Sequence, residues 1–483
     1  MKECSAMRGL VLLALLGNVN SFSSFIQSKN IFQDSASSFR RVGHLFSTVE
    51  DAATKTIVYP PSWEDLYGLI ESTNNLEEKK PLLTLYRDTN GWCPFCERVW
   101  LITRVKNIPC QEVLVNLKDK PAWFTSMVPT GLVPAVLIHE DLTAESKDAS
   151  EPVSERKLVW ESLDIMKALD QAFPDSPRMV YDSREYEEAA EILNTMSSDG
   201  FKFVYQNSSL SNADKIERKM AFNTALDNVD SLMKKYPGSF ILGKEFTGLD
   251  AIAVPMLERW RHQLPLSNEL DILAGRDGIS AWFDAMDSFA PYKERVAGDK
   301  YSWSAVTSFF LKIFGSGSDP SAETLAAMER AEKATVELMS GFSSQVPTEA
   351  VVVTTDIDSQ KKATLEAAKR LILNHNAVIA DCTNPDPKTQ ADLNRATDDG
   401  AAEVADIALR ALAASLLNDD SSVAQVPPEL AESTEKSEVA AKAMRVIAGR
   451  LCVPRDMGAP AAGILRRELM LFADCLNSKC VQV

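Results

Sequence analysis

The chain is 483 residues long, which is more than one compact core usually holds and predicts about three domains. Its 45% hydrophobic and 25% charged residues are typical of a globular protein and exclude both a disordered chain and a membrane bundle. The net charge of −17, without a cluster of Lys and Arg, argues against a nucleic-acid-binding surface. Eight cysteines are too few for a disulfide scaffold and indicate a reducing compartment.

The N-terminal 55 residues predict a two-part targeting sequence. Two basic residues precede the apolar run Gly9–Gly17, which is too short to span a bilayer but suits a signal peptide over residues 1–21. Residues 22–55, rich in serine and poor in acids, are predicted as a transit peptide and linker. This order, with Phe22 after the cleavage point, resembles the presequences of algal plastids bounded by extra membranes. The resemblance implies the plastid stroma, and secretion or the ER lumen is the alternative.

Residues 79–177 alternate between strand and helix periodicity. Strands are predicted over 82–87, 111–117, 135–138 and 158–160, and helices over 94–106, 122–124 and 163–173. A βαβ unit followed by a ββα unit is the order of a thioredoxin fold. This part of the chain is therefore predicted as an α/β domain.

The sequence Cys93-Pro94-Phe95-Cys96 follows the first strand and opens a helix. Pro94 suits the first helical turn, where no backbone N–H is needed. A thiol that faces the N–H groups of a helix N-terminus ionises more readily than a free cysteine, so Cys93 is the predicted nucleophile. Cys96 lies one turn further on and is either a resolving thiol or a small buried hydrophobe. Half of a structural metal site is a further alternative, but no second cysteine pair has the needed spacing, and we predict no metal.

The rest of the chain is predicted to be helical. In residues 183–297 one helix covers 214–236 with an apolar face, and another begins at Thr247, which forms a capping pattern with Asp250. In residues 301–483 four further helices are predicted, over 321–342, 359–380, 403–417 and 432–450. We assign no function to this extension, which offers a surface for a protein partner.

Five segments between residues 79 and 297 occur in an order that resembles one known family. They are Cys93–Trp100, Lys118–Phe124, Gly131–Pro134, Trp160–Ser162 and Asp250–Trp260. The family is the cysteine-type glutathione S-transferases, and the resemblance is closest to the omega and plant lambda classes. It implies a thioredoxin-like domain over 79–177 followed by the all-α transferase domain over 183–297.

The resemblance also implies a binding site for glutathione, a tripeptide with two carboxylates and one ammonium group. Val133 precedes Pro134, which is expected to be cis, and offers its backbone to the cysteinyl unit. Ser162 and the N-terminus of its helix suit the γ-glutamyl carboxylate, and Glu161 suits the ammonium group. Without the motif around them, Glu161 and Ser162 would be read as a simple helix cap.

Two further positions complete the implied glutathione site. Lys120 is expected to reach the glycyl carboxylate, and its alternative is an ordinary solvated lysine before a helix. Phe95, between the two cysteines, is either a ligand contact or part of the core. No membrane span is expected in the mature protein.

The kind of nucleophile sets the expected reaction. Transferases that conjugate glutathione to electrophiles use a Tyr or Ser hydroxyl, whereas a cysteine forms a mixed disulfide with glutathione. Cys93 therefore implies a glutathione-dependent thiol transferase, deglutathionylase or dehydroascorbate reductase, with glutathione as co-substrate and no other cofactor. The alternatives are a non-catalytic carrier of glutathionylated or aromatic metabolites and a redox-sensing interaction protein.

Overall fold

The computed structural model describes residues 59–73, 80–139, 157–205, 210–314, 320–343, 357–384, 395–418 and 424–478. The presequence predicted over residues 1–55 lies outside them. The described residues form two compact units. We call residues 80–334 the sheet unit, and residues 59–73 together with 335–478 the helical unit. Within the described parts of the chain, none of the helices has the length and apolar character to cross a membrane.

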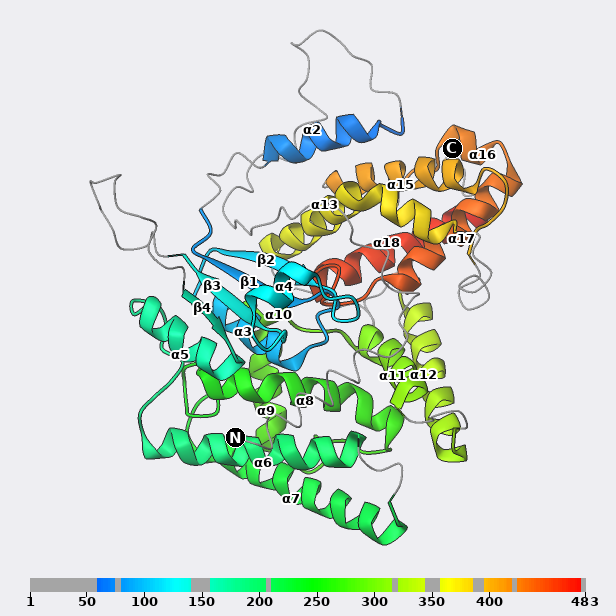
Figure 1. The fold of residues 1–483 in the computed structure, drawn as a ribbon. Helices are drawn as coiled ribbons and strands as arrows, with labels where there is room; N and C mark the ends of the chain where they lie inside the picture. The colour runs from blue at the N-terminus through cyan, green and yellow to red at the C-terminus, as the bar shows by residue number, and fades with distance from the viewer. Residues whose placement is uncertain are drawn as a thin grey trace, which may run out of the picture. The chain divides into compact units, whose positions relative to one another are not determined.

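A four-stranded mixed sheet lies at the centre of the thioredoxin-like part of the sheet unit (Figure 1). Its strands are β1 (Leu83–Asp88), β2 (Cys110–Val115), β3 (Ala135–Ile138) and β4 (Lys157–Trp160). Their order is β2-β1-β3-β4; β2 is parallel to β1, whereas β3 is antiparallel to both β1 and β4. The parallel pair requires a crossover, which contains helix α3 (Pro94–Val105). The predicted α/β thioredoxin-like fold is confirmed.

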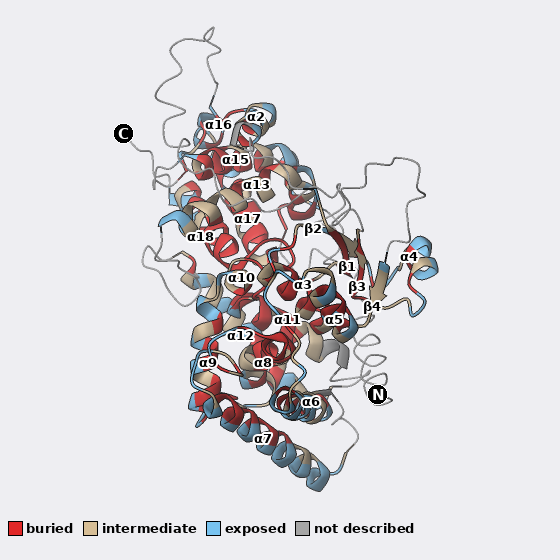
Figure 2. Cartoon of the chain, turned by 90° about the vertical axis from the view of Figure 1, so that its left-hand side faces the viewer, coloured by how far each residue is buried: buried red, intermediate tan, exposed pale blue. Residues whose placement is uncertain are grey.

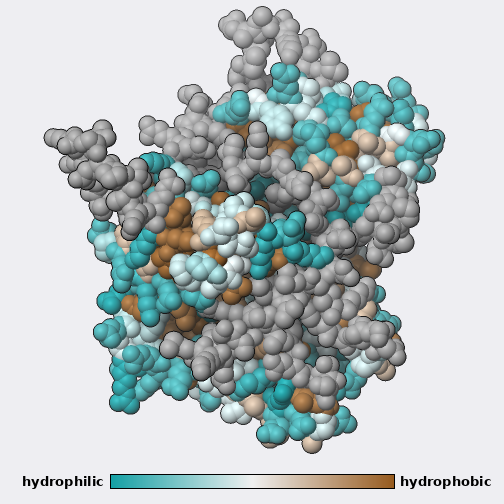
Figure 3. Space-filling model, in the orientation of Figure 1, coloured by the Kyte–Doolittle hydropathy of each residue, from teal (hydrophilic) through white to brown (hydrophobic). Residues whose placement is uncertain are grey.

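Strand β1 is buried along its whole length because helices cover both faces of the sheet (Figure 2). Successive side chains of a strand point to opposite faces. Leu83 and Leu85 pack in the cluster that contains helices α3 and α5 (Ser162–Ala172), whereas Tyr86 packs with Phe124 of α4 (Ala122–Met127). Strand β4 is only partly buried, and hydrophobic surface gathers over β3 and β4 in Figure 3.

The remainder of the sheet unit is helical. Its helices are α6 (Arg184–Tyr205), α7 (Asn212–Lys235), α8 (Gly248–Ser267), α9 (Asp277–Ser288), α10 (Ala290–Lys293), α11 (Lys300–Phe314) and the first part of α12 (Ala322–Gly341). The predicted cap of α8 is confirmed, because Thr247 and Asp250 form a reciprocal capping box. Trp303 of α11 donates from Nε1 to Glu258 of α8 at 2.8 Å. The compact unit that contains the sheet therefore continues past residue 301.

The helical unit contains most of the predicted extension. Its helices are α13 (Ile357–Cys382), α15 (Ala401–Leu417), α16 (Pro428–Ala431), α17 (Thr434–Arg450) and α18 (Ala459–Ser478), together with α2 (Trp63–Thr73). The helices predicted in this region are confirmed to within a few residues. Small buried residues such as Ala408, Ala440 and Ala461 line their contacts and allow close packing. The predictions did not include α2 or the full length of α18.

Helix α2 lies against α13 and α15, which are far away in the sequence (Figures 1 and 2). The Trp63 ring stacks on His375 of α13 with 4.2 Å between ring centroids. Its Nε1 donates to Asp406 of α15 at 2.6 Å, and the Tyr67 hydroxyl donates to the Ile372 carbonyl at 3.1 Å. The segment before the sheet unit thus belongs to the fold of the helical unit.

We expect Trp63→Ala to loosen α2 from the helical unit, because both the stacked ring and the Nε1 hydrogen bond are lost. The expected cost is about 2 kcal/mol, or roughly a 30-fold faster amide hydrogen exchange in α2 and the facing part of α13. Hydrogen-exchange mass spectrometry of the full chain measures this. Trp63→Phe, which keeps a ring, should have a smaller effect, and Glu64→Ala on the exposed face should have none. Unchanged exchange in α2 after Trp63→Ala would contradict the assignment.

Candidate active site

The strand register brings three predicted segments to one edge of the sheet. Tyr86 of β1 pairs with Ala135 of β3, and Ala135 pairs with Trp160 of β4. In antiparallel strands, the residues after β1 and β4 therefore lie beside the residues before β3. These three segments are the loop from Asp88 to Cys93, the pair Val133–Pro134, and the pair Glu161–Ser162. Three segments that are far apart in the sequence thus lie at the same edge of the sheet.

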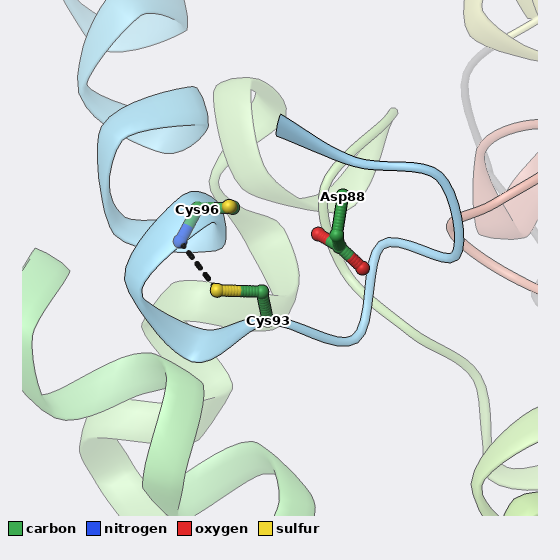
Figure 4. Close-up of side chains that lie close together, drawn as sticks. All are labelled: Asp88, Cys93 and Cys96. Carbon is green, nitrogen blue, oxygen red and sulfur yellow. Dashed lines mark hydrogen bonds between the residues drawn. The ribbon is translucent and has the colours of Figure 1, made fainter. Parts of the chain in front are cut away.

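Cys93 is the N-cap of helix α3, as the sequence predicts. Its Sγ accepts a hydrogen bond from the Cys96 backbone N–H at 3.4 Å (Figure 4). This N–H is one of the donors at a helix start that have no partner within the helix. Pro94 occupies the first turn, and the Cys93 side chain is buried. The sulfur therefore lies at the positive end of the α3 dipole.

Cys96 lies one turn further along α3 and is buried, as Cys93 is. Burial, the hydrogen bond with Cys93 and the negative charges of Cys93 and Asp88 raise the pKa of the Cys96 thiol well above its usual range. Cys96 is therefore protonated at neutral pH. Deprotonation without a neighbouring proton acceptor would place a further negative charge in a buried site.

Asp88, the last residue of β1, lies beside both cysteines and was not among the predicted site residues. Its Oδ2 accepts from the Trp92 backbone N–H at 2.8 Å, whereas its buried Oδ1 makes no hydrogen bond within the described residues. One carboxylate oxygen and the two sulfur atoms lie within 4.8 Å of one another. An acid at the end of an apolar strand, a short loop before a Cys-x-x-Cys sequence, is the signal that could have identified it.

The same three side chains are close enough to share a metal ion. Structural zinc sites usually have four protein donors, and the positive end of a helix is unfavourable for a cation. We therefore assign no metal to Asp88, Cys93 and Cys96.

The backbone at two predicted glutathione-binding segments has unusual geometry. The Val133–Pro134 peptide bond is cis, as expected. Glu161 has a φ of 75°, which is uncommon for a residue other than glycine. Glu161 is the N-cap of α5 but makes no capping hydrogen bond with its side chain. The alternative in which the Glu161 side chain simply caps the helix therefore does not explain this conformation.

Ser162 connects two helices at the site. It is the first residue of α5 and is buried, and its hydroxyl accepts from Arg98 Nη1 of α3 at 2.9 Å. The Arg98 guanidinium also lies 5.7 Å from the centre of the Phe95 ring. Phe95 packs against the hydrophobic cluster that contains Cys93 and Cys96. The sequence motif included Arg98, but its contact with Ser162 was not predicted.

Lys120 lies just before α4 and is half-buried. Burial lowers the pKa of its ammonium group. Among the described residues, Lys120 forms no ion pair or hydrogen bond with the other predicted glutathione-binding residues. Its predicted contact with the glycyl carboxylate stays a prediction.

A buried ion pair holds the start of α3 against α8. Arg259 Nη1 donates to Glu97 Oε2 at 2.6 Å, and Nη2 donates to the Trp92 carbonyl at 2.9 Å. Both charged side chains are buried. Burial raises the pKa of the Glu97 carboxyl, the Arg259 charge opposes this shift, and the neighbouring Glu258 adds to it. The helical domain thus positions the residues on both sides of Cys93.

Two regions of the chain match models of known domains. Residues 92–172 match the N-terminal domain of glutathione S-transferases, and residues 214–285 match the C-terminal domain. The chain is 28% identical over 213 residues to glutathione S-transferase L1 of Arabidopsis thaliana, covering 43% of this chain and 80% of the relative. It is 26% identical over 221 residues to a probable glutathione transferase omega-2 of Caenorhabditis briggsae, covering 44% and 81%.

A solved structure is also similar to this chain. It is the dehydroascorbate reductase of Chlamydomonas reinhardtii, with 17% identity and a TM-score of 0.36, and the match covers 52% of this chain and 98% of that one. The two domain matches lie within the sheet unit. Parts of the sheet unit thus match both domains of glutathione S-transferases, and the chain is similar to lambda and omega members of that family.

Proposed function

We propose that this protein is a glutathione-dependent thiol transferase, acting as a deglutathionylase or dehydroascorbate reductase through a mixed disulfide on Cys93. The observation that carries the proposal is the position of the Cys93 sulfur at the N-cap of α3, where the Cys96 N–H donates to it. Donors at a helix start stabilise a thiolate, which is the reactive form of cysteine. A conjugating transferase would instead need a hydroxyl at this position.

In the proposed cycle, the Cys93 thiolate attacks the glutathione sulfur of a glutathionylated substrate. The bond between substrate and glutathione breaks, and the substrate thiolate leaves and takes a proton from water. A second glutathione thiolate then attacks the glutathione sulfur of the mixed disulfide, which forms glutathione disulfide and regenerates the Cys93 thiolate. With dehydroascorbate as the acceptor, two glutathione molecules supply the two electrons.

The glutathione would lie along the sheet edge where the three segments meet. We assign the Val133 backbone to the cysteinyl unit next to the cis Pro134. Ser162 and the N-terminal N–H groups of α5 are assigned to the γ-glutamyl carboxylate, with Arg98 orienting the hydroxyl, and Glu161 to the ammonium group. We assign Lys120 to the glycyl carboxylate and Phe95 to the wall of the site.

The test of this proposal is intact-mass analysis after treatment with oxidised glutathione. We expect Cys96→Ser to gain one glutathione, which peptide mapping places on Cys93, because the nucleophile remains and the second thiol is absent. The matched control, Cys93→Ser, should gain none at this site. Saturable glutathione binding without any adduct on Cys93 would instead support the carrier function.

The cellular setting follows from the same proposal. A cycle that uses glutathione needs a compartment with reduced thiols. The sequence pattern of residues 1–55 supports delivery to a plastid stroma, where this condition is met.

A further inference from the structure

We propose that Asp88 is the proton acceptor for Cys96 and thereby allows this buried thiol to resolve a mixed disulfide on Cys93. The inference rests on the proposed function, because it concerns the fate of the adduct on Cys93. It adds a second route to the cycle, in which Cys96 replaces the second glutathione.

The charge of the site explains why Cys96 needs a partner. The side chains of Asp88, Cys93 and Cys96 are all buried, with exposed fractions of 2%, 2% and 1%. Loss of the Cys96 proton to solvent would leave an additional negative charge in this low-dielectric region. Transfer of the proton to the Asp88 carboxylate moves one charge between neighbouring atoms and leaves the net charge of the site unchanged. The buried thiol can then react without that desolvation cost.

The hydrogen bonds of Asp88 leave one oxygen available for this role. Oδ2 accepts from the Trp92 N–H, which fixes the carboxylate in the loop before Cys93. Oδ1 is buried and makes no hydrogen bond within the described residues. This oxygen can therefore accept a proton without giving up a hydrogen bond to another described residue.

The geometry places this carboxylate within reach of Cys96. Figure 4 shows the Asp88 side chain, from the end of β1, beside the two cysteines at the start of α3. A carboxylate oxygen and both sulfur atoms lie within 4.8 Å of one another. Contacts between catalytic groups are often long before the substrate binds and shorten in the reacting complex.

The proposed step conserves atoms and electrons. After Cys93 has formed a mixed disulfide with glutathione, the Cys96 thiol gives its proton to Asp88, and its sulfur attacks Cys93 Sγ. The bond between the Cys93 and Cys96 sulfurs forms, the bond between Cys93 and glutathione breaks, and glutathione leaves as a thiolate that takes up the proton. Two further glutathione molecules reduce the Cys93–Cys96 disulfide and are released as glutathione disulfide.

The test follows the two steps separately in the full-length protein, after treatment with EDTA to free the thiols of any metal. Reduced wild-type, Asp88→Asn and Cys96→Ser proteins are mixed with oxidised glutathione, quenched with acid at intervals and weighed intact. Asparagine can still accept from the Trp92 N–H but cannot take a proton, so it preserves the structural contact. Circular dichroism checks that each variant is folded.

In the wild type we expect the adduct on Cys93 to form and then convert to the internal disulfide. Asp88→Asn should still form the adduct on Cys93 and convert it at least about tenfold more slowly than the wild type, and Cys96→Ser should not convert it. Conversion of the Asp88→Asn adduct at the wild-type rate would overturn the proposal, as would an equal slowing of both steps, because that indicates a structural role. Absence of any adduct in Cys96→Ser, in which no second thiol can remove it, would instead overturn the proposed function.

Discussion

Cys93→Ser is expected to abolish glutathione-coupled thiol transfer, whereas Cys96→Ser is expected to retain most of it at saturating glutathione. A serine hydroxyl at the N-cap of α3 accepts the same hydrogen bond but does not form a disulfide, so turnover should fall by at least about 1,000-fold. Cys96 can be dispensed with under these conditions, because a second glutathione releases the adduct from Cys93. Steady-state turnover of a glutathionylated peptide, coupled to glutathione reductase, measures both variants.

The comparison between the two serine variants decides between one-thiol and two-thiol cycles. Cys382→Ser in the helical unit is a suitable control, since it replaces another buried cysteine outside the candidate site. Equal losses in Cys93→Ser and Cys96→Ser would refute the cycle in which Cys93 acts with glutathione alone. Full activity of Cys93→Ser would refute the whole assignment of the nucleophile.

Arg259→Met is expected to destabilise the sheet unit by about 3–5 kcal/mol, the usual cost of breaking a buried ion pair. The substitution leaves Glu97 buried without its cationic partner and removes the hydrogen bond to the Trp92 carbonyl. It also removes the contact of the guanidinium with the Trp303 ring, which lies 4.8 Å away. Urea unfolding followed by tryptophan fluorescence measures the loss.

Two controls make the Arg259 experiment specific. Arg184→Met removes an arginine whose side chain is 87% exposed, and it should leave the urea midpoint of unfolding unchanged. The double variant Glu97→Gln with Arg259→Met should be more stable than Arg259→Met alone, because the unpaired buried charge is gone. If the single and double variants unfold at the same urea concentration, the unpaired charge of Glu97 is not the cause of the lost stability.

The local features of the site are determined by residues that lie close together in the sequence. Pro94 and the apolar strand before it were enough to predict that Cys93 begins a helix, and the structure confirms it as the N-cap of α3. The hydroxyl and acid of Thr247 and Asp250 likewise identified the start of α8. Strand and helix periodicity located the elements of the thioredoxin-like part, because these patterns depend on residues within a few positions of one another.

Contacts between distant segments could not be obtained in this way. The sequence does not show that the Asp88 carboxylate is buried beside two sulfur atoms, since this depends on how β1 and α3 pack. The hydrogen bond from Arg98 to Ser162 and the ion pair between Glu97 and Arg259 likewise join residues on different elements. A buried charge is tolerated only with a matching partner, and the sequence shows the charge but not its burial.

The segments that resemble glutathione S-transferases, the Cys-x-x-Cys sequence and the periodicity of the helices thus suffice for the resemblance, the position of Cys93 at a helix start and the general architecture. The neighbours of Cys93, and the place of helix α2 on the helical unit, are set by the folded chain. The physical reason is that short-range preferences act along the backbone, whereas burial and pairing of side chains depend on segments that meet only after folding.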